Sequence, residues 1–234
     1  MSLQQYARGL AGAMGLLVAG CSGLRSGEPA MVTYSLQSAA SALAISAGDG
    51  VNTGAVARPL AALQVLRPSV QPGLDTDRIA LAGADHRLDY FAASRWSETL
   101  PLVIEAALVE SLRGGGRFEA VHDSVAPFLA NYVLQIDVRN FEAQYAGAAS
   151  TGGIAAAASA PTAVVRLECT LGRRLDRSLI STFVVESRIA ADANRVTAIV
   201  DALARASQSA LREVDAKADA AIATAQLPPT PLPR

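Results

Sequence analysis

Three segments of the sequence alternate between apolar and polar side chains, which is the pattern of half-buried β-strands. They span residues 131–145, 162–173 and 179–190. In the first of them, Ile136 and Val138 share one face of the strand, whereas Asp137 and Arg139 share the other. Shorter strands are predicted from the same signals at 33–37, 60–67, 78–81, 87–92 and 118–122. The alternation therefore predicts a sheet that combines long and short strands.

Two other segments carry apolar residues at helical spacing. The first spans residues 100–112, with Ser97 as the candidate N-cap and three glycines at 114–116 as the stop. The second spans 195–223, and beyond Leu211 its apolar stripe consists mostly of alanine. Two accounts of this weaker half stay open: it packs on a neighbouring subunit or partner, or it frays toward the proline-rich end. Together the segments predict an α+β fold, an antiparallel or mixed sheet with two main helices on one face, in a single domain.

The first twenty residues have the composition of a secretory signal. One arginine, Arg8, precedes an uncharged run at 9–20, which is too short for the ~20 residues that a membrane-spanning helix needs. Small residues end the run, and Cys21 follows at once. A cysteine at this place is typical of a bacterial lipobox, in which the sulfur is the nucleophile that takes the lipid. The alternative is a buried cysteine in a core helix, which the polar stretch after Cys21 disfavours.

These features predict how the chain is divided. Residues 1–20 are the predicted lipoprotein signal peptide, 21–32 a lipidated tether, 33–223 the folded domain and 224–234 a proline-rich tail. The net charge of −1 offers none of the basic excess of nucleic-acid-binding proteins. With Cys21 lipidated, Cys169 has no partner for an intramolecular disulfide. We expect Cys169 to be a small buried hydrophobe on the inward face of its strand.

The sequence contains no catalytic constellation that we can identify. His86 falls in a predicted hairpin turn and His122 at a strand end, and neither belongs to a zinc-ligand spacing. A Gly-x-Ser-x-Gly elbow is absent, and the three glycines follow a helix, so they do not form a phosphate-binding loop. We therefore expect neither a metal nor another cofactor.

Several short motifs lie between the predicted tether and residue 123. They are a Tyr-x-Leu pair, a Pro-Gly-Leu-Asp turn at 72–75, an Arg-Ile step, a Leu-x-Tyr-Phe segment and an Arg-Trp step, with key positions at Tyr34, Leu36, Arg78, Leu88, Tyr90 and Trp96. In these motifs the chain resembles the ABC-type transport auxiliary lipoproteins. This family supplies the lipoprotein of MCE-type intermembrane lipid transporters and includes the paraquat-inducible lipoproteins.

The resemblance implies a non-catalytic subunit that works with an MCE-domain protein and with the permease and ATPase of an ABC transporter. Such a system moves phospholipid between the inner and outer membranes. The subunit would be a periplasm-facing lipoprotein, and Ser22 in place of an aspartate after the lipid cysteine favours the outer membrane. Direct contact with phospholipid and assembly into a homo-oligomer stay open. Two other classes compete: a structural envelope lipoprotein that scaffolds another assembly, and an exported enzyme with an unrecognised site.

Overall fold

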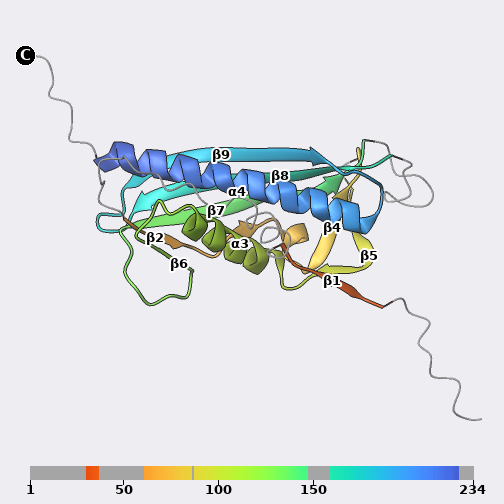
Figure 1. The fold of residues 1–234 in the computed structure, drawn as a ribbon, viewed down its shortest axis with the longest axis horizontal. Helices are drawn as coiled ribbons and strands as arrows, with labels where there is room; N and C mark the ends of the chain where they lie inside the picture. The colour runs from red at the N-terminus through yellow and green to blue at the C-terminus, as the bar shows by residue number, and fades with distance from the viewer. Residues whose placement is uncertain (1–29, 37–60, 86, 147–158, 227–234) are drawn as a thin grey trace, which may run out of the picture. The chain divides into compact units, whose positions relative to one another are not determined.

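The computed structural model describes residues 30–36, 61–85, 87–146 and 159–226. The predicted signal peptide, Cys21, His86, residues 38–57 and most of 146–160 lie outside these ranges. Residues from Met31 onward form one compact unit (Figure 1). Its elements are β1 (Val32–Tyr34), β2 (Ala62–Val65), β3 (Ser69–Val70), the 3-10 helix η1 (Pro72–Leu74), β4 (Arg78–Ala82), β5 (Leu88–Trp96), α3 (Leu100–Gly114), β6 (Ala120–His122), β7 (Tyr132–Gln144), β8 (Thr162–Arg173), β9 (Leu179–Ala190) and α4 (Val196–Gln226).

Strand β7 is the centre of the sheet. Along one edge it pairs antiparallel with β8, and β8 pairs antiparallel with β9. Along its other edge three short strands pair with it in parallel: β2 near its start, β3 in its middle and β4 near its end. β5 joins β4 antiparallel, β1 joins β5 in parallel, and β6 joins β2 in parallel. The sheet is therefore mixed, which confirms the predicted fold class.

A β-bulge interrupts β7 at Arg139. Val138 pairs with Leu167 and Asn140 pairs with Arg166, so Arg139 is an extra residue in the ladder. Up to Val138 the even-numbered side chains of β7 face the core; beyond the bulge Phe141 and its odd-numbered successors do. A single inserted residue thus exchanges the two faces of the strand, because side chains in a strand alternate with a period of two.

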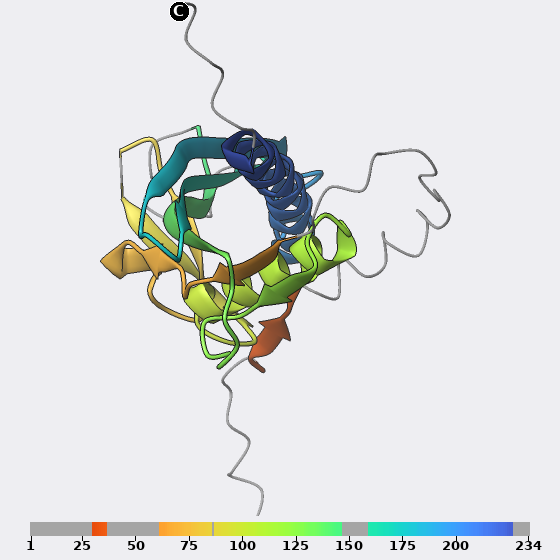
Figure 2. The same cartoon turned by 90° about the vertical axis from the view of Figure 1, so that its left-hand side faces the viewer.

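Helices α3 and α4 lie side by side along one face of the curved sheet (Figures 1 and 2). The far half of α4 is buried within the domain itself, since Val214, Ala218 and Ile222 lie in the core. It contacts β8 and β9. Both accounts of this half given by the sequence are therefore wrong. Its apolar side chains pack inside this domain, and the helix continues to Gln226. Alanine suits this position because it lets the helix approach the sheet closely.

The N-cap of helix α3 lies two residues later than the sequence predicts. Thr99, and not Ser97, occupies the N-cap position, and it makes no side-chain capping hydrogen bond. The backbone N–H of Leu100 instead donates to the carbonyl of Thr76 at 3.0 Å, and that of Ser97 donates to Tyr34 at 2.8 Å. These tertiary bonds hold the chain extended through Ser97 and so delay the helix. None of the helices in the described residues has the length and hydrophobicity needed to cross a bilayer.

Candidate functional site

Four of the motif residues meet where η1 packs on β4 and β5. The hydroxyl of Tyr90 donates a hydrogen bond to the carbonyl of Gly73 at 2.7 Å. The Arg78 guanidinium lies 4.1 Å from the centre of the Tyr90 ring, a cation–π distance. A Cβ atom at Gly73 would lie 2.5 Å from Cδ2 of Leu88, so a larger residue here would require the Leu88 side chain to move. We call this arrangement the Tyr90 clamp.

The other motif residues lie elsewhere. Trp96 is buried and meets Phe141 edge to face, with ring centres 5.8 Å apart. The backbone carbonyl of Tyr34 accepts a hydrogen bond from Ser97, just before α3, and Leu36 is buried at the wall of a separate cavity between α3 and α4. The structure therefore brings Arg78, Leu88 and Tyr90 together but not Trp96 or Leu36. Cys21 lies outside the described residues.

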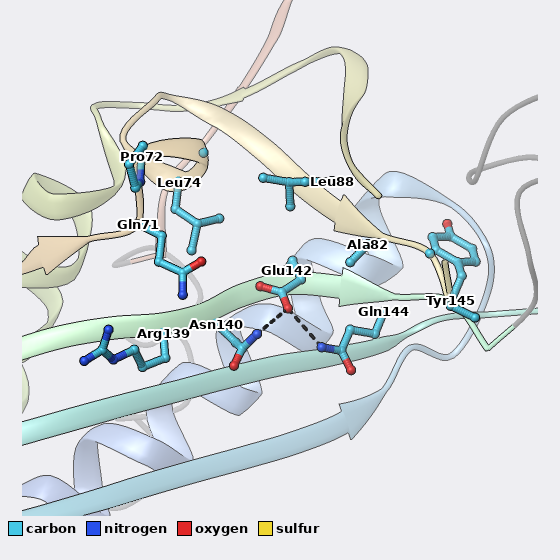
Figure 3. A pocket seen from close by; sticks show the side chains of 13 residues that line it. Gln71, Pro72, Leu74, Ala82, Leu88, Arg139, Asn140, Glu142, Gln144 and Tyr145 are labelled. Carbon is cyan, nitrogen blue, oxygen red and sulfur yellow. Dashed lines mark hydrogen bonds between the residues drawn. The ribbon is translucent and has the colours of Figure 1, made fainter. Parts of the chain in front are cut away.

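A cavity of about 540 Å³ adjoins the Tyr90 clamp (Figure 3). Leu74 of η1 and Leu88 of β5 line one side, and the polar residues that follow the bulge in β7 line the other. The full lining is Gln71, Pro72, Gly73, Leu74, Ala82, Gly83, Ala84, Leu88, Arg139, Asn140, Glu142, Gln144 and Tyr145. The bulge produces this polar wall, because it turns the even-numbered side chains of β7 away from the core.

Glu142 is the central acidic group of the cavity and is only 4% exposed. Its Oε1 accepts hydrogen bonds from Nδ2 of Asn140 at 2.8 Å and from Nε2 of Gln144 at 2.9 Å, as Figure 3 shows. Its Oε2 accepts from the backbone N–H of Phe141 at 2.8 Å. Three donors therefore compensate for the loss of water around this carboxylate.

One ion pair and two hydrogen bonds to amide side chains surround the outer edge of the cavity. Arg139 donates to Glu168 at 2.7 Å, and this hydrogen bond and the charge of Glu168 raise the pKa of Arg139 above its usual value. Arg188 donates to Oε1 of Gln144 at 2.7 Å, which holds the amide that faces Glu142. At the end of β7 the Tyr145 hydroxyl donates to Asn194 at 2.7 Å, and burial raises the pKa of this phenol.

The nucleophilic and metal-binding candidates of the sequence do not join this cavity, whose lining includes neither Cys169 nor His122. In the described ranges no three His, Cys, Asp or Glu side chains gather as they would to hold a metal ion. Burial raises the pKa of the Cys169 thiol to about 12, so it stays protonated and unreactive. His122 instead lies beside the ring of Phe128, with ring centres 5.5 Å apart.

The sequence analysis missed the polar wall of the cavity. Its signal was present in the sequence as amide, acid and amide at alternate positions of a strand, namely Asn140, Glu142 and Gln144. The two amides each have a side-chain N–H₂ that can donate to the carboxylate between them. This spacing places all three on one face of the strand.

Comparisons with known proteins agree with the motifs. The family model described as ABC-type transport auxiliary lipoprotein component matches residues 42–215. A solved structure of a DUF330 protein from Xanthomonas campestris is 21% identical, with a TM-score of 0.61, and covers 70% of this chain and 87% of its own. A second, described as an uncharacterized protein, is 15% identical with a TM-score of 0.53, covering 67% of this chain and 90% of its own. Both likenesses show a shared fold. None of the curated proteins is significantly similar in sequence.

Proposed function

The chain belongs to the family of ABC-type transport auxiliary lipoprotein components, and from this membership we propose a specific role for it. It is a non-catalytic subunit of an MCE-type system that moves phospholipid between the inner and outer membranes. Membership in a lipoprotein family implies a membrane-anchored protein that faces the periplasm. The observation that carries the proposal is the family match over residues 42–215, together with the motifs of the Tyr90 clamp.

The structure supports a binding subunit over the enzyme alternative. An active site needs ionisable groups that are free to exchange a proton with a substrate. The carboxylate of Glu142 is instead held by three donors from its own strand. The scaffold alternative differs from the proposal only in the partners that the subunit binds. Partner identity therefore decides between them.

The proposal includes a lipid on Cys21 and a place at the outer membrane. Cys21 follows the small residues that end the apolar run, and Ser22 follows it. We expect metabolic palmitate to label the wild-type chain and the labelled protein to fractionate with the outer membrane. Cys21→Ser should abolish the label, because serine lacks the thiol that takes the lipid. Cys169→Ser is the matched control and should keep the label; equal labelling of Cys21→Ser and wild type would refute the anchor.

Co-purification tests the transport role. A tagged MCE-domain protein encoded beside this gene should retain the chain together with the permease and ATPase, and lipid analysis of the complex should find phospholipid. If the chain is retained by a different envelope assembly and not by the MCE-domain protein, the scaffold alternative holds. A complex free of phospholipid would also contradict the proposal.

A further inference from the structure

Five large apolar side chains are strongly exposed in two neighbouring loops. Three belong to the loop between β6 and β7, and two lie at the turn between β8 and β9. Their exposed fractions range from 64% to 94%, and we call them the apolar tips: Val125, Phe128, Leu129, Leu175 and Leu179. A scattered exposed leucine is ordinary, but a group of this size at one end of a domain marks a surface that binds something.

Hydrogen bonds and strand register place the two loops together. Tyr132, at the start of β7, pairs with Arg173 at the end of β8. Just beyond this pair the backbone N–H of Arg174 donates to the carbonyl of Asn131 at 2.9 Å. The Arg174 side chain also donates to Gln64 on β2. The bases of the two loops are therefore joined, at the end of the domain where β7 begins.

The turn between β8 and β9 is basic as well as apolar, whereas the loop between β6 and β7 carries one acid, Asp123. The β8–β9 turn contains Arg173, Arg174 and Arg177 against a single acid, Asp176, which pairs with Arg173 at 3.3 Å. Arg177 has a φ of 57°, in the left-handed region, and closes the turn that carries Leu175. Leucine and phenylalanine side chains flanked by arginine suit the interface of an anionic bilayer. There the apolar groups enter the acyl boundary and the guanidinium groups stay among the phosphates.

The form of the surface also favours a bilayer over a protein. The most exposed side chains, Leu175 and Val125, project from two separate loops and are 94% and 85% exposed. A folded partner would need matching hollows for each loop, whereas a fluid bilayer adapts to separate projections.

We propose that the apolar tips insert into an anionic lipid surface and give the domain a membrane contact of its own. The insertion of the tips does not rest on the proposed function.

Vesicle flotation of the unlipidated full-length Cys21→Ser chain tests the inference. The protein should float with vesicles of phosphatidylglycerol and phosphatidylethanolamine, and more weakly with phosphatidylcholine alone. Adding Leu129→Ser with Leu175→Ser should weaken binding at least about tenfold, because each change removes an apolar group from the acyl boundary. Arg177→Gln should lower the preference for phosphatidylglycerol about fivefold. Val184→Ser, at an exposed position in the middle of β9, is the matched control and should bind like the parent chain.

Three outcomes would overturn the inference. One is a parent chain that fails to float with anionic vesicles; another is a double variant that floats as well as its parent while circular dichroism shows it folded. If the double variant changes the molecular size in lipid-free solution, the tips form a protein interface instead. Flotation needs neither an anchor nor a transport partner, so a failed co-purification with intact flotation would count against the proposed function alone.

Discussion

The thiol of Cys169 faces the core from β8 and is 2% exposed, as the sequence predicts. Burial raises its pKa from the usual 9.0 to about 12. Between these values the folded chain keeps a proton that the unfolded chain releases, so stability falls as pH rises through this window. At about pH 10 the loss due to this thiol should be about 1.4 kcal/mol.

Urea unfolding of wild type and Cys169→Ala near pH 8 and near pH 10 measures this effect. Near pH 8 the variant should be less stable by about 0.5–3 kcal/mol, because it loses a buried sulfur. Between the two pH values the free energy of unfolding of the variant should fall by about 1.4 kcal/mol less than that of wild type. An equal loss in both proteins would mean that the thiol ionises freely in the folded state.

Glu142 provides a second test on a single side chain. Glu142→Gln replaces one acceptor oxygen by an N–H₂ group, which then faces a donor, either the Phe141 N–H or the two neighbouring amides. The expected loss is about 1–3 kcal/mol in the free energy of unfolding. Glu186→Gln is the matched control, since Glu186 pairs with Arg166 and Arg188 at the surface and should matter by less than about 1 kcal/mol. Equal effects would show that the hydrogen bonds within the cavity carry no stability.

The burial of the far half of α4 predicts how this helix responds to mutation. Ile222, in its penultimate turn, is 1% exposed and belongs to the main core. Ile222→Ala should cost about 2–5 kcal/mol in thermal or urea unfolding, because it leaves a cavity against the sheet. Ala220→Ser, on the exposed face two residues earlier, should change stability by less than about 0.5 kcal/mol. If Ile222→Ala were as mild as the control, the helix end would be frayed in solution.

Strand β7 shows where reading the sequence stops being sufficient. The alternation of its buried and exposed side chains up to Val138 was predicted correctly, because this alternation depends only on neighbouring residues. The bulge at Arg139 depends on how β8 lies beside β7, and nothing in the segment itself specifies it. The wall formed by Asn140, Glu142 and Gln144 follows from the bulge, so the cavity was missed together with it.

For the whole molecule, the fold class and both helices could be predicted because each rests on local periodicity. The parallel pairing of β2, β3 and β4 with β7 could not, because it joins segments that lie far apart in the chain; Ala62 and Asn131, which share hydrogen bonds, are 69 positions apart. The family motifs predicted residues of the Tyr90 clamp but not their arrangement, which needs the contact between η1 and β5. Cys21 stays a prediction.

The central place of β7 has a consequence for the order in which this chain folds. Strands β2, β3 and β4 are made first, but all three pair with β7, which begins only at Tyr132. During synthesis they emerge without this partner, and bringing such distant segments together is the slow part of sheet formation. The β7–β8–β9 meander is antiparallel and sequential, so it can form first and serve as the template. The N-terminal half of the domain therefore depends on the C-terminal half to complete its sheet.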